Sequence, residues 1–334
     1  MRSAFVVFLV LAVAACAPVV KPMGPAVTAP AVTADAIVAA DGAALPLRRW
    51  LPEATPKAVI LGLHGFNDYS RAFEAPGAWF AAHGIATYAY DQRGFGGAPD
   101  PGYWAGTDTL TADLRAAVAA LRGRHPGIPF YVLGNSMGGA VALAAFADGP
   151  IEGVDGAILS APAVWGRDHM NVLQTALLFV LSRTVPWLTL TGQGLNRRPS
   201  DNIAMLRALG RDPLVIKETR VDAIEGLVDL MDAAYAAAQN GVARPPLLVM
   251  YGARDEIVPK NPVGEAMRSL AARNGARTAL YETGWHMLLR DLAAETVWRD
   301  IAAWTADRQA PLPSGADARA AKMPTADRSA ADTR

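Results

Sequence analysis

The stretch Gly134-Asn135-Ser136-Met137-Gly138 decides how this sequence folds. It follows a short apolar run, 131–133, and precedes an alanine-rich segment, 138–146, that favours a helix. Between a strand and a helix, such a serine sits on a sharp, strained turn. Glycines two positions before and after it let the two backbones pass closely. The pattern is typical of a serine hydroxyl presented as a nucleophile.

Short apolar runs alternate with helical patterns along most of the chain. Strands are expected at 58–63, 86–90, 131–133, 157–160, 247–251 and 277–281. Several are apolar on both faces, as parallel strands covered by helices must be. Segments such as 110–121 carry apolar residues at the three- and four-residue spacing of a helix. The alternation predicts an α/β fold, a mostly parallel central sheet with helices on both faces. Runs at 36–40 and 45–50 predict an antiparallel hairpin at the sheet edge.

The alternation breaks between residues 163 and 244, where we expect a helical cap inserted into an α/β domain of residues 35–308. Segment 172–181 is apolar almost all round, so its helix is core or in contact with lipid, or both if it packs on the domain and also lines a substrate cleft. A second helix has a clean apolar face that includes Ile224 and Met231. Both segments are assigned to the cap.

Composition excludes some partners. Hydrophobic residues make up 52% of the 334 residues and charged residues 19%, which indicates a well-packed protein. The formal net charge is zero and basic residues form no run, so nucleic acid is excluded as a partner. Residues 309–334 have almost no large apolar side chain after Leu312, and we expect a disordered tail.

The N-terminus has the pattern of a secretory signal. Arg2 precedes an apolar run, 4–13, that is too short to span a bilayer but fits a signal peptide of residues 1–15. Cys16 is the only cysteine, so no intramolecular disulfide can form. Val13-Ala14-Ala15-Cys16 resembles the lipobox of bacterial lipoproteins. The alternative is an ordinary signal peptide with small residues near its cleavage site.

The lipobox resemblance implies that Cys16 is the lipidated first residue of the mature chain. The protein would then be lipid-anchored in the bacterial cell envelope, with a membrane as its partner. Ala17 replaces the aspartate that retains such proteins at the inner membrane, which favours the outer membrane. Residues 16–34 are rich in Pro, Ala, Val and Thr and are expected to form a flexible tether.

A serine hydroxyl needs a base to take its proton. Of the five histidines, His286 alone follows the last predicted strand and precedes the C-terminal helix, where the base of this strand–turn–helix arrangement is expected. His83 and His125 have the sequence context of helix ends and are predicted to be structural. His169 is predicted to lie on the surface.

The base in turn needs a carboxylate that fixes its tautomer. Asp255 follows a strand and a glycine turn, and the order Ser136, Asp255, His286 is the one that this arrangement requires. Glu256 is the adjacent rival. Asp91 also follows a strand, but it precedes the serine, so the order counts against it.

The developing oxyanion needs backbone N–H donors. The amide of Met137, directly after the serine, is one candidate, and the amide of Phe66, after the strand 58–63, is the second. His64 has no second ligand at metal-binding spacing, so no metal is expected. The sequence also lacks a phosphate loop or dinucleotide motif after a strand, so no cofactor is expected.

Five motifs together resemble the monoacylglycerol lipase and lysophospholipase branch of the α/β-hydrolases, which is grouped with serine aminopeptidases. They are His64-Gly65-Phe66, Asp91-Gln92-Arg93-Gly94-Phe95-Gly96, Gly134-Asn135-Ser136-Met137-Gly138-Gly139, Gly252-Ala253-Arg254-Asp255 and Gly284-Trp285-His286. The resemblance covers about residues 35–308. Ala98 departs from it, because the family has serine there. Asp91 and Arg93 are interpreted as residues that stabilise the fold.

The resemblance implies a serine carboxylic ester hydrolase acting on a single-chain lipid ester, a monoacylglycerol or a lysophospholipid, bound in an apolar tunnel under the cap. Two enzyme alternatives use the same scaffold, an aminopeptidase or amidase and a short-chain esterase. A non-catalytic envelope lipoprotein is a fourth hypothesis, although such proteins often lose a member of the catalytic set and here all three are present.

Overall fold

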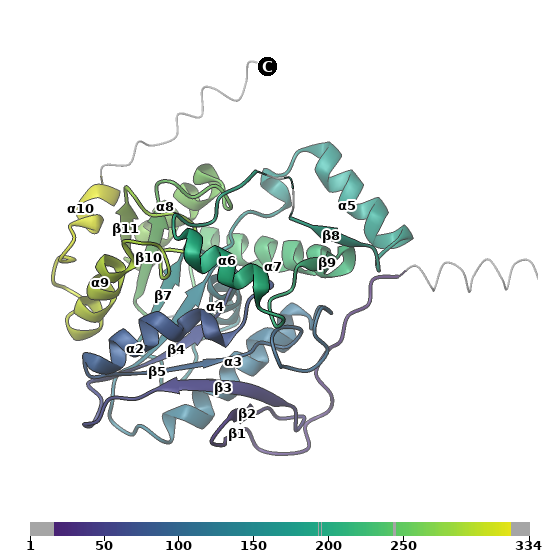
Figure 1. The fold of residues 1–334 in the computed structure, drawn as a ribbon. Helices are drawn as coiled ribbons and strands as arrows, with labels where there is room; N and C mark the ends of the chain where they lie inside the picture. The colour runs from purple at the N-terminus through teal and green to yellow at the C-terminus, as the bar shows by residue number, and fades with distance from the viewer. Residues whose placement is uncertain (1–16, 193, 195, 243–244, 322–334) are drawn as a thin grey trace, which may run out of the picture.

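The computed structural model describes residues 17–321 except 193, 195, 243 and 244. The predicted signal peptide (1–15), the predicted lipidation site Cys16 and the end of the predicted tail lie outside the described residues. Figure 1 shows a twisted central sheet with helices on both faces and a smaller layer of helices and short strands above it.

The central sheet has the order β1-β2-β3-β5-β4-β6-β7-β10-β11 within the described residues. Neighbours from β5 to β11 are parallel, whereas β1, β2 and β3 pair antiparallel. The strands are β1 (Ala31–Val32), β2 (Ala36–Val38), β3 (Ala44–Trp50), β4 (Ala58–Leu63), β5 (Ile85–Tyr90), β6 (Phe130–Asn135), β7 (Gly156–Ser160), β10 (Leu247–Gly252) and β11 (Arg277–Tyr281). The predicted strands and hairpin are confirmed, with ends that differ by no more than two residues.

Two helical layers cover the sheet, each with its own apolar core. On one face lie α3 (Thr107–Arg122), α4 (Met137–Ala147), α7 (Val221–Asn240) and α8 (Lys260–Asn274). On the other lie α2 (Glu74–Ala82), α9 (Ala294–Ala306) and the short α10 (Ala316–Ala320). All residues of α4 except its last are buried, because the sheet covers one side and α3 and α7 the other. This central position fixes the helix that begins directly after Ser136.

The cap is smaller than predicted. It contains α5 (Val172–Thr184), α6 (Ile203–Arg211) and an antiparallel ribbon of β8 (Thr189–Thr191) and β9 (Glu218–Arg220). The assignment of the following helix to a cap of residues 163–244 is wrong, because α7 packs on α4 and α8 and leads into β10. Leu230, Ala234 and Ala238 of α7 are fully buried in the core. An apolar stripe predicts a buried face, but it does not tell which element covers that face.

Helix α5 projects from the rest of the molecule (Figure 1) and is not core, so that alternative for segment 172–181 is wrong. Its large apolar side chains and those of the following loop and strand are exposed: Val172, Leu173, Leu177, Phe179, Val180, Trp187, Leu188 and Leu190. Arg183 pairs with Glu225 at 2.7 Å and ties the end of α5 to α7. In the part of the chain that the structure describes, no helix combines the length and apolarity needed to cross a bilayer.

The prediction of a flexible tether is corrected for the described residues 17–34. The backbone N–H of Val19 donates to Asp222, that of Lys21 to the carbonyl of Trp104, and that of Met23 to the hydroxyl of Thr109. Further on, β1 pairs with β2. Backbone hydrogen bonds hold this segment against the domain. Any residue type except proline can donate such bonds, so the amino-acid composition of the segment did not predict its docking.

The C-terminal segment also differs from the expected disordered tail as far as residue 321. Leu312 and Ala316 are buried in the apolar core to which α9 also contributes, and α10 packs beside β11. Arg277 of β11 pairs with Asp317 at 2.9 Å. Small buried alanines anchor this segment. The prediction relied on large apolar residues, so it did not detect them.

Asp91 and Arg93 have structural surroundings, as the sequence indicated. Arg93 donates to Asp41 and Asp113, each at 2.7 Å, and all three side chains are buried. Asp91 accepts from the backbone N–H groups of Ser70 and Gly97. These contacts tie the loop after β5 to α3 and to the β2–β3 hairpin, because a buried charge must be paired.

Candidate active site

Ser136 lies on the tight turn between β6 and α4. Its backbone has φ 52° and ψ −114°, in the left-handed region that non-glycine residues avoid. The neighbouring glycines are required for space. A Cβ atom at Gly138 would lie 2.2 Å from the carbonyl oxygen of Leu63, and one at Gly134 would lie 2.4 Å from that of Gly138. The turn therefore has the geometry that the five-residue motif predicts.

His286 lies between Ser136 and Asp255. Its Nε2 atom is 3.0 Å from the Ser136 hydroxyl, and its Nδ1 atom is 2.8 Å from Asp255 Oδ2. The three residues follow the carboxyl ends of β6, β10 and β11, which are parallel and end at the same edge of the sheet. The structure thus brings together three side chains that are up to 150 positions apart in the sequence.

Asp255 is held by its own loop. Its Oδ1 atom accepts from the backbone N–H groups of Ile257 at 2.7 Å and Val258 at 3.0 Å, which leaves Oδ2 for the imidazole. The rival Glu256 is exposed and accepts from the backbone N–H of Arg198 instead. Because Asp255 Oδ2 accepts the hydrogen bond of Nδ1–H, the proton of the neutral imidazole stays on Nδ1, and Nε2 is free to accept from the serine.

Of the two predicted oxyanion donors, Met137 directly follows Ser136 in sequence, and Phe66 follows a glycine that lies close to Ser136. Met137 is the first residue of α4, so its N–H has no acceptor within the helix. Phe66 follows Gly65, at which a Cβ atom would lie 3.4 Å from that of Ser136. This loop is braced by His64, which accepts from the backbone N–H of Gln92 and contacts the carbonyl of Gly65 at 2.8 Å. Complete burial lowers the pKa of His64, which favours its neutral form.

The other histidines lie outside this cluster. His83 stacks on Trp79, and His125 contacts the hydroxyl of Tyr88 at 2.9 Å. His169, predicted to be a surface residue, is half-buried against Tyr235 at the base of the cap. The contacts of His83 and His125 are those of structural histidines, as predicted, whereas His169 is more buried than predicted.

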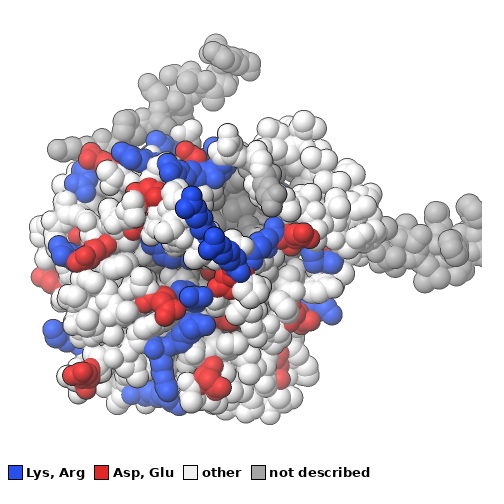
Figure 2. Space-filling model, in the orientation of Figure 1, with Lys and Arg blue, Asp and Glu red and all other residues white. Residues whose placement is uncertain are grey.

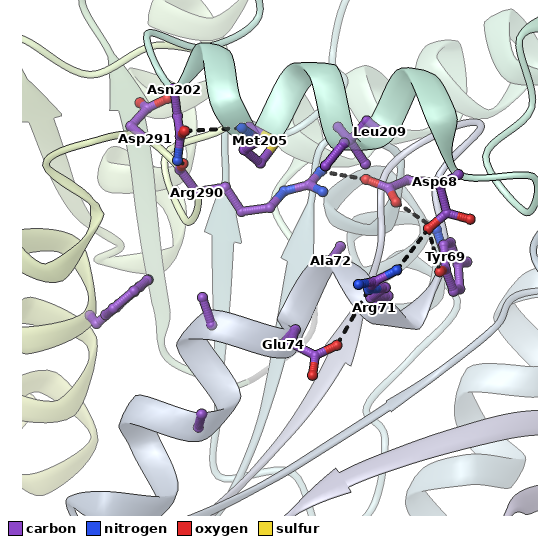
Figure 3. Close-up of a pocket in the computed structure, with 15 residues that line it drawn as sticks. Asp68, Tyr69, Arg71, Ala72, Glu74, Asn202, Met205, Leu209, Arg290 and Asp291 are labelled. Carbon is purple, nitrogen blue, oxygen red and sulfur yellow. Dashed lines mark hydrogen bonds and ion pairs between the residues drawn. The ribbon is translucent and has the colours of Figure 1, made fainter.

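A separate cavity of about 510 Å³ lies beneath α6, between this helix and α2 (Figure 3). Met205 and Leu209 of α6 line its upper wall. The buried ion pair of Asp68 and Arg290 lies between α6 and the helical segment of Tyr69 and Arg71. None of Ser136, Asp255 and His286 belongs to its lining.

Sequence reasoning missed the polar residues around the histidine loop. Arg290 and Asp291 follow His286 by four and five positions, and Ser200 comes from the cap. The Ser200 hydroxyl donates to Asp291 at 2.6 Å, and both side chains are buried. One signal was available, because a carboxylate only five positions from His286 in sequence must lie near it in space.

Sequence comparison places the chain among known enzymes. The model of the serine aminopeptidase S33 family matches residues 54–293. A monoacylglycerol lipase of Mycolicibacterium smegmatis is 26% identical over 270 residues, which cover 76% of this chain and 90% of the relative. The monoglyceride lipase of Homo sapiens is 26% identical over 284 residues, covering 82% of this chain and 90% of the relative.

Solved structures agree on the fold. The monoacylglycerol lipase of Paleococcus ferrophilus superimposes with a TM-score of 0.63 at 22% identity and covers 78% of this chain and 98% of its own. A soluble variant of the monoglyceride lipase of Saccharomyces cerevisiae, in complex with a substrate analogue, gives a TM-score of 0.69 at 20% identity, with coverages of 87% and 99%.

The family match covers most of the chain, and the sheet order and the serine turn are those of an α/β-hydrolase. The chain is therefore a serine hydrolase that belongs to the serine aminopeptidase S33 family, in the monoacylglycerol lipase-like branch of the α/β-hydrolases.

Proposed function

We propose that this protein hydrolyses carboxylic esters of single-chain lipids, monoacylglycerols or lysophospholipids, with Ser136, His286 and Asp255 as its catalytic triad. The observation that carries the proposal is the position of the His286 imidazole, within hydrogen-bond reach of both the serine hydroxyl and the aspartate. A lipase or esterase activity fits the relatives, which are named monoacylglycerol and monoglyceride lipases.

The reaction follows from this geometry. His286 Nε2 takes the proton of Ser136 as the serine oxygen attacks the ester carbonyl, and Asp255 stabilises the imidazolium. The N–H groups of Phe66 and Met137 stabilise the oxyanion. The imidazolium then protonates the leaving alcohol as the C–O bond breaks, which leaves an acyl-serine. Water, deprotonated by His286, then attacks this ester, and the imidazolium gives the proton to the Ser136 oxygen as the C–O bond breaks and the fatty acid is released.

A lipid substrate is supported by the exposed apolar surface of α5. Figure 2 shows a mostly uncharged surface over α5, whereas Lys and Arg side chains gather beside a hollow in the adjoining face. Val172 is 86% exposed and Leu173 76% exposed. Contact of such an apolar patch with water is unfavourable, so the patch indicates a site that a partner covers. In this proposal the cap rests on the membrane surface and takes its substrate from there.

The N-terminal segment supports the same orientation. Val19 is bonded to Asp222, shortly after β9, so the chain leaves the domain beside the cap. A lipid on Cys16 would enter the membrane next to α5. The proposal therefore includes a lipid anchor at Cys16, in the outer membrane of a bacterial envelope.

The first test measures hydrolysis of an ester series from acetyl to palmitoyl, together with an aminoacyl amide, by the full chain in detergent. We expect activity to rise with acyl length and to be absent on the amide. Preference for the amide would favour an aminopeptidase or amidase, and preference for the acetyl ester a short-chain esterase. Either result would contradict the proposed substrate class.

A second test concerns α5. The double substitution Leu173→Asp and Leu177→Asp is expected to lower hydrolysis of monoacylglycerol in vesicles by at least roughly tenfold, because two apolar side chains lose their burial in lipid. Turnover of a soluble ester should not change. Leu51→Asp is the control, since Leu51 is 48% exposed but lies after β3, outside the cap. An equal loss in the control, or no loss in the double variant, would argue against membrane docking by α5.

A further inference from the structure

One segment of the cap, residues 198–202, is bonded to both loops that carry the proposed acid and base. The N–H of Arg198 donates to Glu256, next to Asp255. The other bonds go to the histidine loop: Met287 N–H to the Pro199 carbonyl, Asn202 side-chain amide to the Arg290 carbonyl, and Leu292 N–H to Asp201. The cap and the catalytic loops are therefore joined at several adjacent points.

Asp291 lies at the centre of these bonds. One of its oxygens accepts from the Ser200 hydroxyl at 2.6 Å, and the other accepts from the backbone N–H of Trp285 at 2.8 Å. Trp285 directly precedes His286, so this bond fixes the backbone from which the imidazole extends. Figure 3 shows Asp291 close to Asn202, at the start of α6.

The burial of this carboxylate makes its partners important. Asp291 is 6% exposed and Ser200 is fully buried. Burial raises the pKa of Asp291, and the bonds from Ser200 and Trp285 oppose that rise. A buried carboxylate that loses a hydrogen-bond donor carries an uncompensated desolvation cost. The loop that carries it is therefore expected to rearrange. The Ser200 hydroxyl, which belongs to the cap, is thus needed by a group that belongs to the histidine loop.

We propose that Asp291 and Ser200 are positioning residues that lock the His286 loop to the cap, so that the placement of the cap sets the distance from His286 to Ser136. This inference rests on the proposed triad. Neither side chain contacts Ser136, and neither is assigned a place in substrate binding. Their effect is expected in kcat, because a small displacement of a base weakens proton transfer more than it weakens binding.

The experiment compares Ser200→Ala, Asp291→Asn and the double variant on a soluble short-chain ester, with kcat expressed per active site titrated by a fluorophosphonate. Each single substitution is expected to lower kcat roughly tenfold to a hundredfold with little change in KM. Because the two residues act as one unit, the double variant should be no slower than the slower single variant.

Ser314→Ala is the matched control. Ser314 also donates its hydroxyl to a buried carboxylate, Asp300, which in turn accepts from Tyr281 at the end of β11. Ser314 lies next to α10, and none of its hydrogen bonds among the described residues reaches residues 282–292. This variant is expected to lose thermal stability and to keep its kcat. If Ser200→Ala and Asp291→Asn behave like Ser314→Ala, or if their effects on kcat simply multiply, the positioning role is refuted.

Failure of the inference can be told apart from failure of the proposed function by adding Ser136→Ala to the series. Equal turnover in Ser136→Ala and the unmodified chain would refute the triad itself. A large loss in Ser136→Ala, with an unchanged kcat in Ser200→Ala, would leave the triad in place and refute only the coupling to the cap. Ser200→Ala removes a single oxygen, so it keeps the test decisive if Asp291→Asn does not fold.

Discussion

Replacing Ser136 with alanine is expected to lower ester turnover by roughly a million-fold. In the proposed mechanism the substitution removes the atom that forms the acyl-enzyme, and His286 and Asp255 then have no nucleophile to activate. The fold should be retained, because alanine fits the space of serine and its Cβ meets the same strained backbone. The measurements are turnover of a soluble ester at high enzyme concentration and the thermal unfolding midpoint.

Ser160→Ala is the matched control for this variant. Ser160 is fully buried at the end of β7, and its backbone carbonyl accepts from the N–H of Ser136 at 2.9 Å. Its hydroxyl has no hydrogen-bond partner among the described residues, so removing it should cost little. Activity near that of the unmodified chain is expected. Turnover by Ser136→Ala comparable to that of Ser160→Ala would show that another residue is the nucleophile.

Replacing Asp255 with asparagine is expected to lower kcat by roughly ten thousand-fold. An amide N–H facing His286 Nδ1 favours the tautomer with the proton on Nε2, which can no longer accept from Ser136. The bonds to Ile257 and Val258 need only one oxygen of this side chain, so the loop should keep its shape. The measurement is kcat on the soluble ester across a range of pH.

Glu256→Gln is the control, because it makes the same change of carboxylate to amide one position along the chain. The new amide side chain keeps an oxygen that can accept from the N–H of Arg198, and it does not reach the imidazole in place of Asp255. Near-normal kcat is expected. A larger loss in Glu256→Gln than in Asp255→Asn would assign the acid to Glu256.

The sheet could be predicted from the sequence because its central strands are buried on both faces. Every residue of β4, β5, β6, β7 and β10 is buried, and such strands read as uninterrupted apolar runs between turns. Ser136, Asp255 and His286 could then be assigned because each of them follows the carboxyl end of a predicted strand. Their spatial proximity could be predicted because the carboxyl ends of parallel strands lie at the same edge of the sheet.

The extent of the cap could not be predicted, since helix periodicity specifies a buried face and not its partner. α7 has the same apolar stripe whether it covers a cap or packs on α4. The docking of residues 17–34 was also invisible, because contacts such as Val19 to Asp222 are made by the backbone N–H. Asp291 and Ser200 are 91 positions apart, and local spacing carries no sign of their contact.

The left-handed backbone at Ser136 has a consequence for how this protein can change over time. A non-glycine residue in that conformation costs about 1–3 kcal/mol, and the close passage at Gly134 and Gly138 confines the turn further. Glycine at position 136 would relieve the strain and remove the hydroxyl in the same step. Selection for stability and selection for catalysis therefore act in opposite directions at this residue. If selection for activity were lost, substitutions here would be expected to give an inactive but more stable protein.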